Sequence, residues 1–225
     1  MALIHKTTLV PSKLELVAPW LSAQPWYVGT DRAPELTKSG GFRLDDPEGE
    51  VGIEFMVVTD RSGDDPRSYH VPLTYRATAL DGADRGLIGT TKHGVLGHRW
   101  VYDGTHDPVL RAGLLDLLAG RTEPQAQSIT DTPDPTVIPE LNGPALPADA
   151  VVTAVDNGSH GTDLTVEVPS SEELFTLHLV RALQPGALAT ATPEVRAHLT
   201  AEWCAPEATA PKHRALFAAL GPAAP

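Results

Sequence analysis

Cysteine is almost absent from this sequence of 225 residues, which contains only Cys204. A single cysteine cannot form an intrachain disulfide, and it excludes a metal site built from several cysteines. The sequence also lacks any run of 18 consecutive apolar residues, so we expect no transmembrane helix. Its first residues, MALIHKTTLV, lack the basic and then apolar order of a signal peptide. These absences predict a cytoplasmic protein.

Positive charge is scarce as well. The chain has 17 lysine and arginine residues against 29 aspartate and glutamate residues, which gives a net charge of −12 and an isoelectric point of about 5.1. A surface of this sign repels nucleic acids and anionic lipids, so we expect neither as a partner. The hydrophobic fraction of 41% is ordinary for a globular protein, and the length allows one large domain or two small ones.

Familiar catalytic and metal-binding motifs are missing too. There is no GxSxG nucleophile motif, no Walker A sequence and no GxGxxG. The densest histidines are His93, His98 and His106, whose spacing fits no metal-binding motif. Ser159 and His160 are adjacent in NGSHGTD, which is typical of a hairpin tip rather than of a catalytic pair. From these patterns we expect no catalytic residues, no metal and no cofactor.

The first half of the chain has clear secondary-structure patterns. LIHKTTLV predicts a strand over residues 3–10, and the segment that follows predicts a helix over residues 11–24. Residues 40–103 have the turn and strand pattern of antiparallel β-structure. DPVLRAGLLDLLAG predicts a helix over residues 107–119, with Asp107 as its N-cap. Together these elements predict a domain over residues 1–120, formed by a curved antiparallel sheet with packed helices.

The second half is divided from the first by proline. Residues 121–147 contain six prolines and no convincing periodicity, so we interpret them as a linker or a long extended connection. Beyond it, AVVTAVDNG, TDLTVEV and ELFTLHLVRAL predict a small three-stranded antiparallel sheet. A helix over residues 192–203 and a short helix in the tail PKHRALFAALGPAAP should follow. The expected fold class is therefore α+β, with a second domain over residues 148–225.

Several stretches of the first half resemble the N-terminal cap domain of actinobacterial maltokinases. LVAPWLSAQPWYVG (residues 16–29) is similar to the family's helix-ending tryptophan motif, although Pro25 stands where the family usually has arginine. YHVPLTYR (residues 69–76) and LIGTTKHGVLGHRWVYDGTHDPV (residues 87–109) also resemble the cap. The resemblance covers roughly residues 1–120. The matching positions of the tryptophan motif are Trp20, Leu21, Gln24, Trp26 and Gly29.

The second half is similar to the intermediate subdomain of these enzymes, which forms the ATP-facing lobe of the kinase. LHLVRALQPG resembles a family strand of the form LKLxRxLxPG, which places His178 at the position of the phosphate-binding lysine. The resemblance places Ser159 in the nucleotide-covering hairpin and Glu194 at the glutamate of the following helix. The family continues into a helical lobe with the catalytic aspartate and the magnesium ligands, whereas this chain ends at Pro225. The resemblance thus implies a degenerate lobe that binds no nucleotide.

Three functions follow from this resemblance. The first is a non-catalytic interaction or regulatory module with a protein partner in trehalose, maltose or α-glucan metabolism. The second is one half of a split sugar kinase, which a separate lobe would complete. The third is a sugar- or glucan-binding module. For a ligand or partner surface, the available aromatic residues are Trp20, Trp26, Tyr27, Trp100 and Tyr102.

Overall fold

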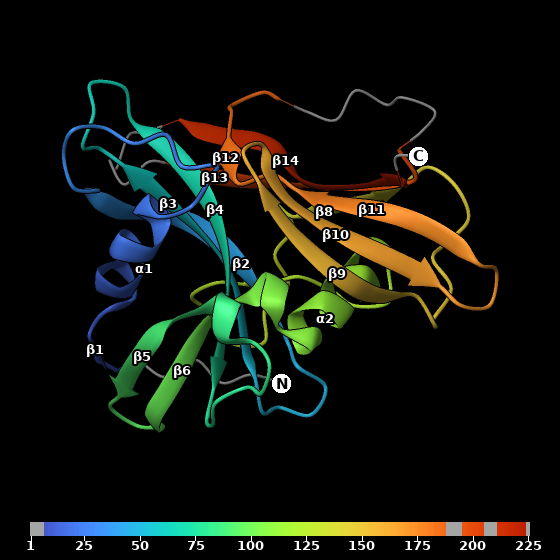
Figure 1. Ribbon diagram of the computed structural model, residues 1–225, viewed down its shortest axis with the longest axis horizontal. Helices are drawn as coiled ribbons and strands as arrows, with labels where there is room; N and C mark the ends of the chain where they lie inside the picture. Colours follow the sequence, from blue (N-terminus) through green and yellow to red (C-terminus); the bar gives the residue numbers. More distant parts are fainter. Residues whose placement is uncertain (1–6, 188–194, 205–210, 224–225) are drawn as a thin grey trace.

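The computed structural model describes residues 7–187, 195–204 and 211–223. In this part of the chain the strands form two antiparallel sheets, called here sheet A and sheet B (Figure 1). Sheet A consists of β1 (Leu9–Val10), β2 (Leu36–Leu44), β3 (Gly52–Asp60), β4 (Arg67–Arg76), β5 (Leu87–His93), β6 (Gly97–Asp103), β7 (Gln125–Ala126) and β12 (Ala182–Leu183). Sheet B consists of β8 (Ile138–Leu141), β9 (Val151–Gly158), β10 (Gly161–Val168), β11 (Glu173–Leu179), β13 (Ala197–Cys204) and β14 (Lys212–Pro222).

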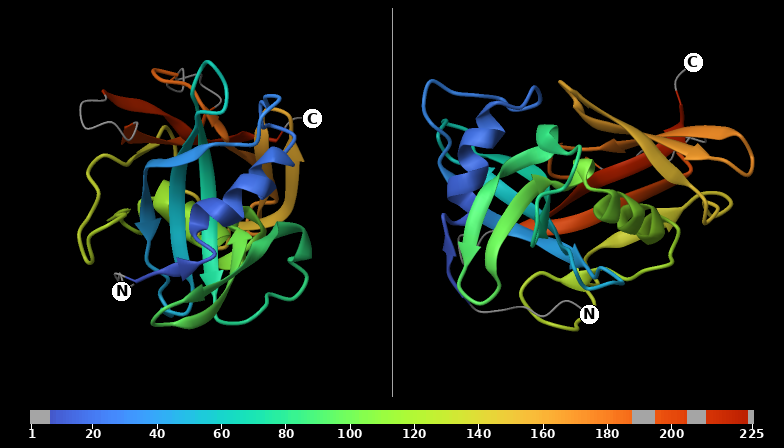
Figure 2. Two further views of the ribbon diagram at one scale, coloured as in Figure 1. Left: turned by 90° about the vertical axis from the view of Figure 1, so that its left-hand side faces the viewer. Right: turned by 60° about the horizontal axis from the view of Figure 1, so that its bottom comes forward.

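Sheet A is curved, and its strand order is β1-β5-β6-β4-β3-β2-β7, with β12 added beside β4. The helix α1 (Lys13–Ser22) lies across one of its faces, as the left-hand view of Figure 2 shows. Ser12 caps this helix, since its hydroxyl accepts from the N–H of Glu15 while the Glu15 carboxylate accepts from the N–H of Ser12. The expected curved antiparallel sheet with packed helices is confirmed.

The central strand β3 is buried on both faces, which explains its continuous apolar run. Phe55 and Val57 belong to a core shared with sheet B, whereas Met56 and Val58 pack in a second core with α1. A strand that is covered on both faces has no side that faces solvent. Its sequence is therefore a continuous apolar run, and polar residues do not alternate with apolar ones. The buried polar residues of β3 are Glu54, Thr59 and Asp60, and the contacts of Glu54 are described below.

The helix α2 (Pro108–Leu118) matches the sequence prediction closely. The Asp107 side chain accepts from the N–H of Val109, Pro108 occupies the first turn, and Gly120 follows the helix with a φ of 70°. One face of the helix is buried between the sheets, through Leu110, Leu114, Leu115, Leu117 and Leu118. Two shorter 3-10 helices, η1 (Asp84–Gly86) and η2 (Gly104–His106), complete the helical content of the described residues.

Sheet B is where the sequence prediction was wrong. The chain forms six strands in the order β8-β13-β14-β11-β10-β9, instead of three strands and two helices. The segment expected to be helical up to residue 203 contains β13, and the expected tail helix is β14. Residues 188–194 lie outside the described part, so the start of the first of these helices is not tested there. Of the strand expected over residues 3–10, the described part forms β1 at Leu9–Val10.

The errors have a physical cause in both strands. In β13 every second side chain belongs to the hydrophobic core, which is the period of a strand. The sequence predicts a helix here because helix-start signals precede this short segment. In β14 the register shifts beside Leu199 and Thr200, so that Phe217 is an extra residue between Leu216 and Ala218. This bulge buries two successive residues and interrupts the alternation, which made the sequence look helical.

Residues 121–147 follow an extended course that includes the short strands β7 and β8. Val137 and Leu146 of this stretch are buried in the larger hydrophobic core. The same core contains Phe42 of β2, Leu114 of α2 and Phe217 of β14, so it crosses the expected boundaries. The division at residues 120 and 147 stays a prediction.

Candidate functional site

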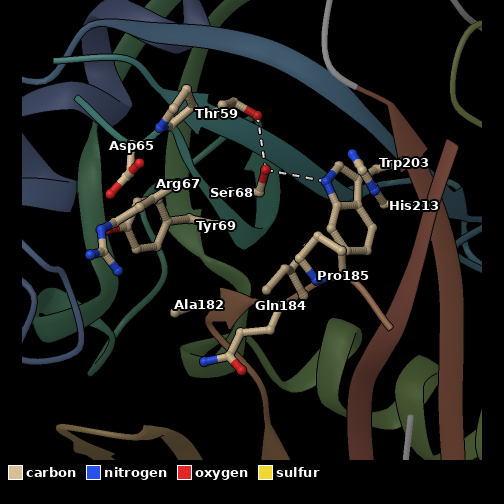
Figure 3. A pocket seen from close by; sticks show the side chains of 12 residues that line it. Thr59, Asp65, Arg67, Ser68, Tyr69, Ala182, Gln184, Pro185, Trp203 and His213 are labelled. Atoms are coloured by element: carbon tan, nitrogen blue, oxygen red, sulfur yellow. Dashed lines mark hydrogen bonds between the residues drawn. The ribbon is translucent and has the colours of Figure 1, made fainter. Parts of the chain in front are cut away.

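A pocket of about 320 Å³ lies where the two sheets meet (Figure 3). Three parts of the chain form it: the hairpin of β3 and β4, the β12 segment with the two residues after it, and the facing ends of β13 and β14. Its lining consists of Thr59, Asp65, Pro66, Arg67, Ser68, Tyr69, Ala182, Leu183, Gln184, Pro185, Trp203 and His213. Convergence of several segments on one hollow is typical of ligand sites.

One wall of the pocket is a chain of hydroxyl groups. The indole Nε1 of Trp203 donates to Ser68 Oγ at 3.2 Å, and Ser68 Oγ lies 3.0 Å from Thr59 Oγ1. Trp203 and Tyr69 are 3% and 0% exposed, so their ring faces are covered by protein. Stacking of a ligand on an aromatic face, the usual mode for sugars, is therefore closed to these two rings.

The rim of the pocket carries the groups that are free to meet a ligand. Asp65, Arg67 and Gln184 are exposed, and His213 packs against Trp203 with 5.6 Å between ring centres. A carboxylate, a guanidinium and an amide can together bind a small polar molecule through hydrogen bonds. Sequence reasoning missed this pocket, because only the junction of the two sheets brings its residues together.

The five predicted aromatic residues are brought together only in part. Trp20 and Trp26 meet edge to face with ring centres 5.8 Å apart, and Tyr27 lies 5.4 Å from the ring of Tyr69. Trp26 is only 3% exposed, and its indole Nε1 donates to Asn157 Oδ1 at 2.7 Å. These contacts indicate that Trp26 anchors α1 to sheet B.

The other two aromatic residues lie elsewhere. Trp100 packs against His98 with ring centres 4.4 Å apart, and Tyr102 is buried with its hydroxyl accepting from the N–H of Leu80. Burial and a hydrogen bond to Asp60 raise the pKa of the Tyr27 hydroxyl to about 12. Trp26 and Tyr102 are buried, and a ligand or partner surface formed by the five residues stays a prediction.

The predicted nucleotide-lobe residues lie on the hairpin β9–β10 and the neighbouring β11. His178 pairs with Asp163 across the two strands, with 2.6 Å between Nδ1 and Oδ1. Ser159 is exposed in the two-residue turn of the hairpin. A Cβ at Gly161 would lie 2.8 Å from His178 Cε1, so the backbone of the hairpin passes close to this imidazole. Glu194 lies outside the described residues.

The largest fully buried side chain in the described part of the chain is that of Arg181, two residues after β11. It is fully covered, and its Nη2 donates to both carboxylate oxygens of Asp103 at 2.9 and 2.7 Å. Its Nε donates to Thr162 Oγ1, and its guanidinium lies 5.2 Å from the ring centre of Trp26. Because Asp103 belongs to sheet A and Thr162 to sheet B, this arginine joins the two sheets. An arginine within the apolar run LHLVRAL was the sequence signal for it.

A second buried charge, Glu54, lies on β3 inside the curve of sheet A. Its carboxylate accepts from the Lys13 ammonium, from Tyr75 Oη at 2.7 Å and from Gln127 Nε2 at 2.9 Å. Burial alone would raise the pKa of this carboxyl, but Lys13 and Tyr75 outweigh it and hold the pKa below its ordinary value. With these bonds formed, Glu54 holds α1 to the sheet and has little capacity left for a ligand.

Two kinds of feature are absent from the described residues, a metal cluster and a membrane-spanning helix. Within residues 7–187, 195–204 and 211–223, no cluster of three or more histidine, cysteine, aspartate or glutamate side chains has the geometry to hold a metal ion. In the same part of the chain, no helix has the length and apolar character needed to cross a membrane.

Comparison with known proteins supports the identification of the first half. Residues 20–107 match the family described as the maltokinase N-terminal cap domain. The match begins at Trp20 in the tryptophan motif, includes strands β2 to β6 of sheet A, and ends at the N-cap of α2. A search of curated proteins gives no match. Residues 20–107 of this chain are therefore similar to the maltokinase N-terminal cap domain.

Proposed function

We propose that this protein is a non-catalytic cap-type module that acts in the cytoplasm through a protein partner in maltose, trehalose or α-glucan metabolism. The match of residues 20–107 to the maltokinase cap domain is the observation that carries the proposal, since it connects the chain to sugar phosphorylation. The described part of the chain offers no metal cluster that would support an unrelated metal-dependent activity.

The arrangement of β9, β10 and β11 supports a degenerate nucleotide lobe. In protein kinases a glycine-rich hairpin covers the phosphates, and the third strand carries the lysine that pairs with them. Here a hairpin is likewise followed by β11, but its tip is the short turn Ser159–His160 and no lysine is present on β11.

The side chain at the lysine position is also already engaged. His178 is held by Asp163, and an imidazole is shorter than a lysine side chain and a weaker cation. Phosphoryl transfer depends on positioning and on neutralising phosphate charge. We therefore expect this lobe to bind Mg-ATP poorly.

The test is calorimetry with ATP and magnesium, together with an ADP-release assay with maltose. We expect neither heat of binding at millimolar ATP nor turnover. The variant His178→Lys should still give no turnover, because it restores one of several groups that act as a unit. Turnover by the unmodified chain would overturn the non-catalytic proposal.

The second candidate is a split sugar kinase, and the hairpin followed by β11 is the observation that favours it. In this case a separate helical lobe would supply the catalytic carboxylates. The discriminating measurement is the melting temperature of the chain with a candidate partner lobe, with and without ATP. An ATP-dependent rise seen only in the mixture would favour the split kinase over the non-catalytic module.

A further inference from the structure

The negative charge of this protein is concentrated in one stretch of the chain. Residues 122–180 contain ten aspartate and glutamate residues and no lysine or arginine, so they carry −10 of the net −12. This stretch includes β9, β10 and β11 of sheet B. Its exposed carboxylates include Asp149, Asp156, Asp163, Glu167 and Glu172. One of these carboxylates, that of Glu173, lies 3.7 Å from the guanidinium of Arg196.

The strand β9 in this acidic stretch is an open sheet edge. Among the edge strands of the described chain, β1 and β7 have two residues each, and β8 has four with Pro139 and Glu140 inside it. Short length, proline and charge are the usual protections of an edge. In contrast, β9 is eight residues long, contains one charged residue, Asp156, and neither proline nor lysine, and pairs with β10 alone.

The side chains of β9 show which part of the edge is accessible. Val151 is 47% exposed, and Thr153, Ala154 and Asp156 are exposed as well. At the other end, the Asn157 side chain is bonded to Gln24 and Trp26, which brings the end of α1 against the strand. A bulge at Thr153 twists the strand but leaves residues on both sides in extended conformation. The accessible edge therefore runs from Val151 to Asp156.

We propose that the free edge of β9 is a strand-addition site for an extended, basic segment of a partner protein. Main-chain hydrogen bonds to the edge would give affinity, and alternate side chains of the added strand would meet the face that carries Asp163 and Glu167. Lysine or arginine at those positions would be attracted to the carboxylates of Asp156, Asp163 and Glu167. This inference rests on the proposed function, in that it gives the chemistry of the expected partner.

A second copy of the chain fits this edge less well. Pairing two β9 strands would bring two stretches of charge −10 together, which is repulsive at physiological ionic strength. A basic segment instead neutralises the surface it covers. The same charge pattern disfavours an acidic segment of any partner.

The experiment uses the whole chain and a fluorescent peptide in which lysine and valine alternate. We expect saturable binding by anisotropy, weakened by salt, and at least tenfold weaker binding when glutamate replaces lysine. A peptide N-methylated at alternate amides keeps the charge but loses the main-chain bonds. It should also bind at least tenfold more weakly. Hydrogen exchange should slow in residues 151–156 when the unmodified peptide is bound.

A matched pair of variants separates the effect of blocking the β9 edge from the effect of adding one positive charge. Ala154→Lys places a lysine on the edge, as natural protected edges have, and should weaken peptide binding at least tenfold. Thr176→Lys makes the same change of charge on the central strand β11 and should weaken it by less than threefold. Circular dichroism of both variants verifies that the sheets are intact.

Several results would overturn the strand-addition site. They are equal binding of the N-methylated peptide, equal effects of the two lysine variants, no peptide binding at millimolar concentration, or a dimer that Ala154→Lys dissociates. None of them bears on whether the chain turns over ATP. Conversely, maltose phosphorylation would remove the non-catalytic proposal and leave the peptide result standing, so the two failures are distinguishable.

Discussion

Sheet A buries a charged residue in its central strand, whereas sheet B has a long free edge strand and exposed carboxylates. In sheet A, both faces of the central strand are covered, and Glu54 is bonded to Lys13, Tyr75 and Gln127. In sheet B, one face packs on the shared core, whereas the edge strand β9 and several carboxylates face solvent. The comparison teaches that buried charge joins the elements of sheet A and the two sheets to each other, while sheet B presents the free edge that we propose as a partner site.

Arg181→Leu should give the largest loss, because it breaks the connection between the sheets. The change leaves the Asp103 carboxylate buried without its cation, which typically costs about 3–5 kcal/mol of unfolding free energy. Urea denaturation measures it. The control is Asp163→Asn, which breaks a partly exposed pair on sheet B and should cost about 1 kcal/mol or less. Equal losses of unfolding free energy in the two variants would refute the view that the buried pair between the sheets contributes more than the exposed pair on sheet B.

Leu114→Ala should destabilise both sheets together. Leu114 is fully buried in the core that joins α2, sheet A and sheet B, and such a truncation costs about 2–5 kcal/mol. Ala112→Ser, an exposed change on the same helix, should cost less than about 0.5 kcal/mol. The measurement is thermal unfolding followed separately by tryptophan fluorescence and by backbone circular dichroism. Two separated transitions would mean that the sheets unfold independently.

Between pH 6.5 and pH 5, the pH dependence of stability gives the smallest of these effects and tests the buried junction again. His70 is 1% exposed; burial and the nearby Arg181 lower its pKa to about 3. The unfolded chain, with a histidine pKa near 6.5, binds the proton more readily, so stability falls as pH drops from 6.5 towards 3. The slope from this group reaches about 1.4 kcal/mol per pH unit.

His70→Leu removes this contribution, so its stability should change less with pH in that window. The window above pH 5 is the informative part, because carboxyls with lowered pKa values, such as Glu54, add a loss of the same sign below it. Urea unfolding at several pH values compares the two slopes. Parallel curves for the variant and the unmodified chain would show that His70 does not titrate as its burial implies.

Local signals in the sequence were sufficient for several elements. Asp107, Pro108 and Gly120 determined the limits of α2, because caps act within one helical turn. The tryptophan motif, together with residues 69–76 and 87–109, was sufficient to identify the cap resemblance, which the family match confirms for residues 20–107. The strands β9, β10 and β11 were also predicted, since tight turns separate short β-rich runs.

Other features could not be predicted because their cause is non-local. The bulge at Phe217 depends on how β14 pairs with β13, so its broken alternation looked helical. The pocket residue Ser68 is more than a hundred residues away from Gln184 and Trp203 in the sequence. The free edge of β9 likewise exists only because no other strand pairs with it in the described chain.

By itself the sequence determined the acidic charge, the scarcity of cysteine, the capped helix α2 and the cap-type tryptophan motif, because each depends on composition or on neighbours in the chain. Only the tertiary structure decided which groups are buried and which are free. Arg181 connects the two sheets because it donates hydrogen bonds to Asp103 of sheet A and Thr162 of sheet B. Burial and strand pairing are properties of the folded chain, since they depend on residues that meet only after folding.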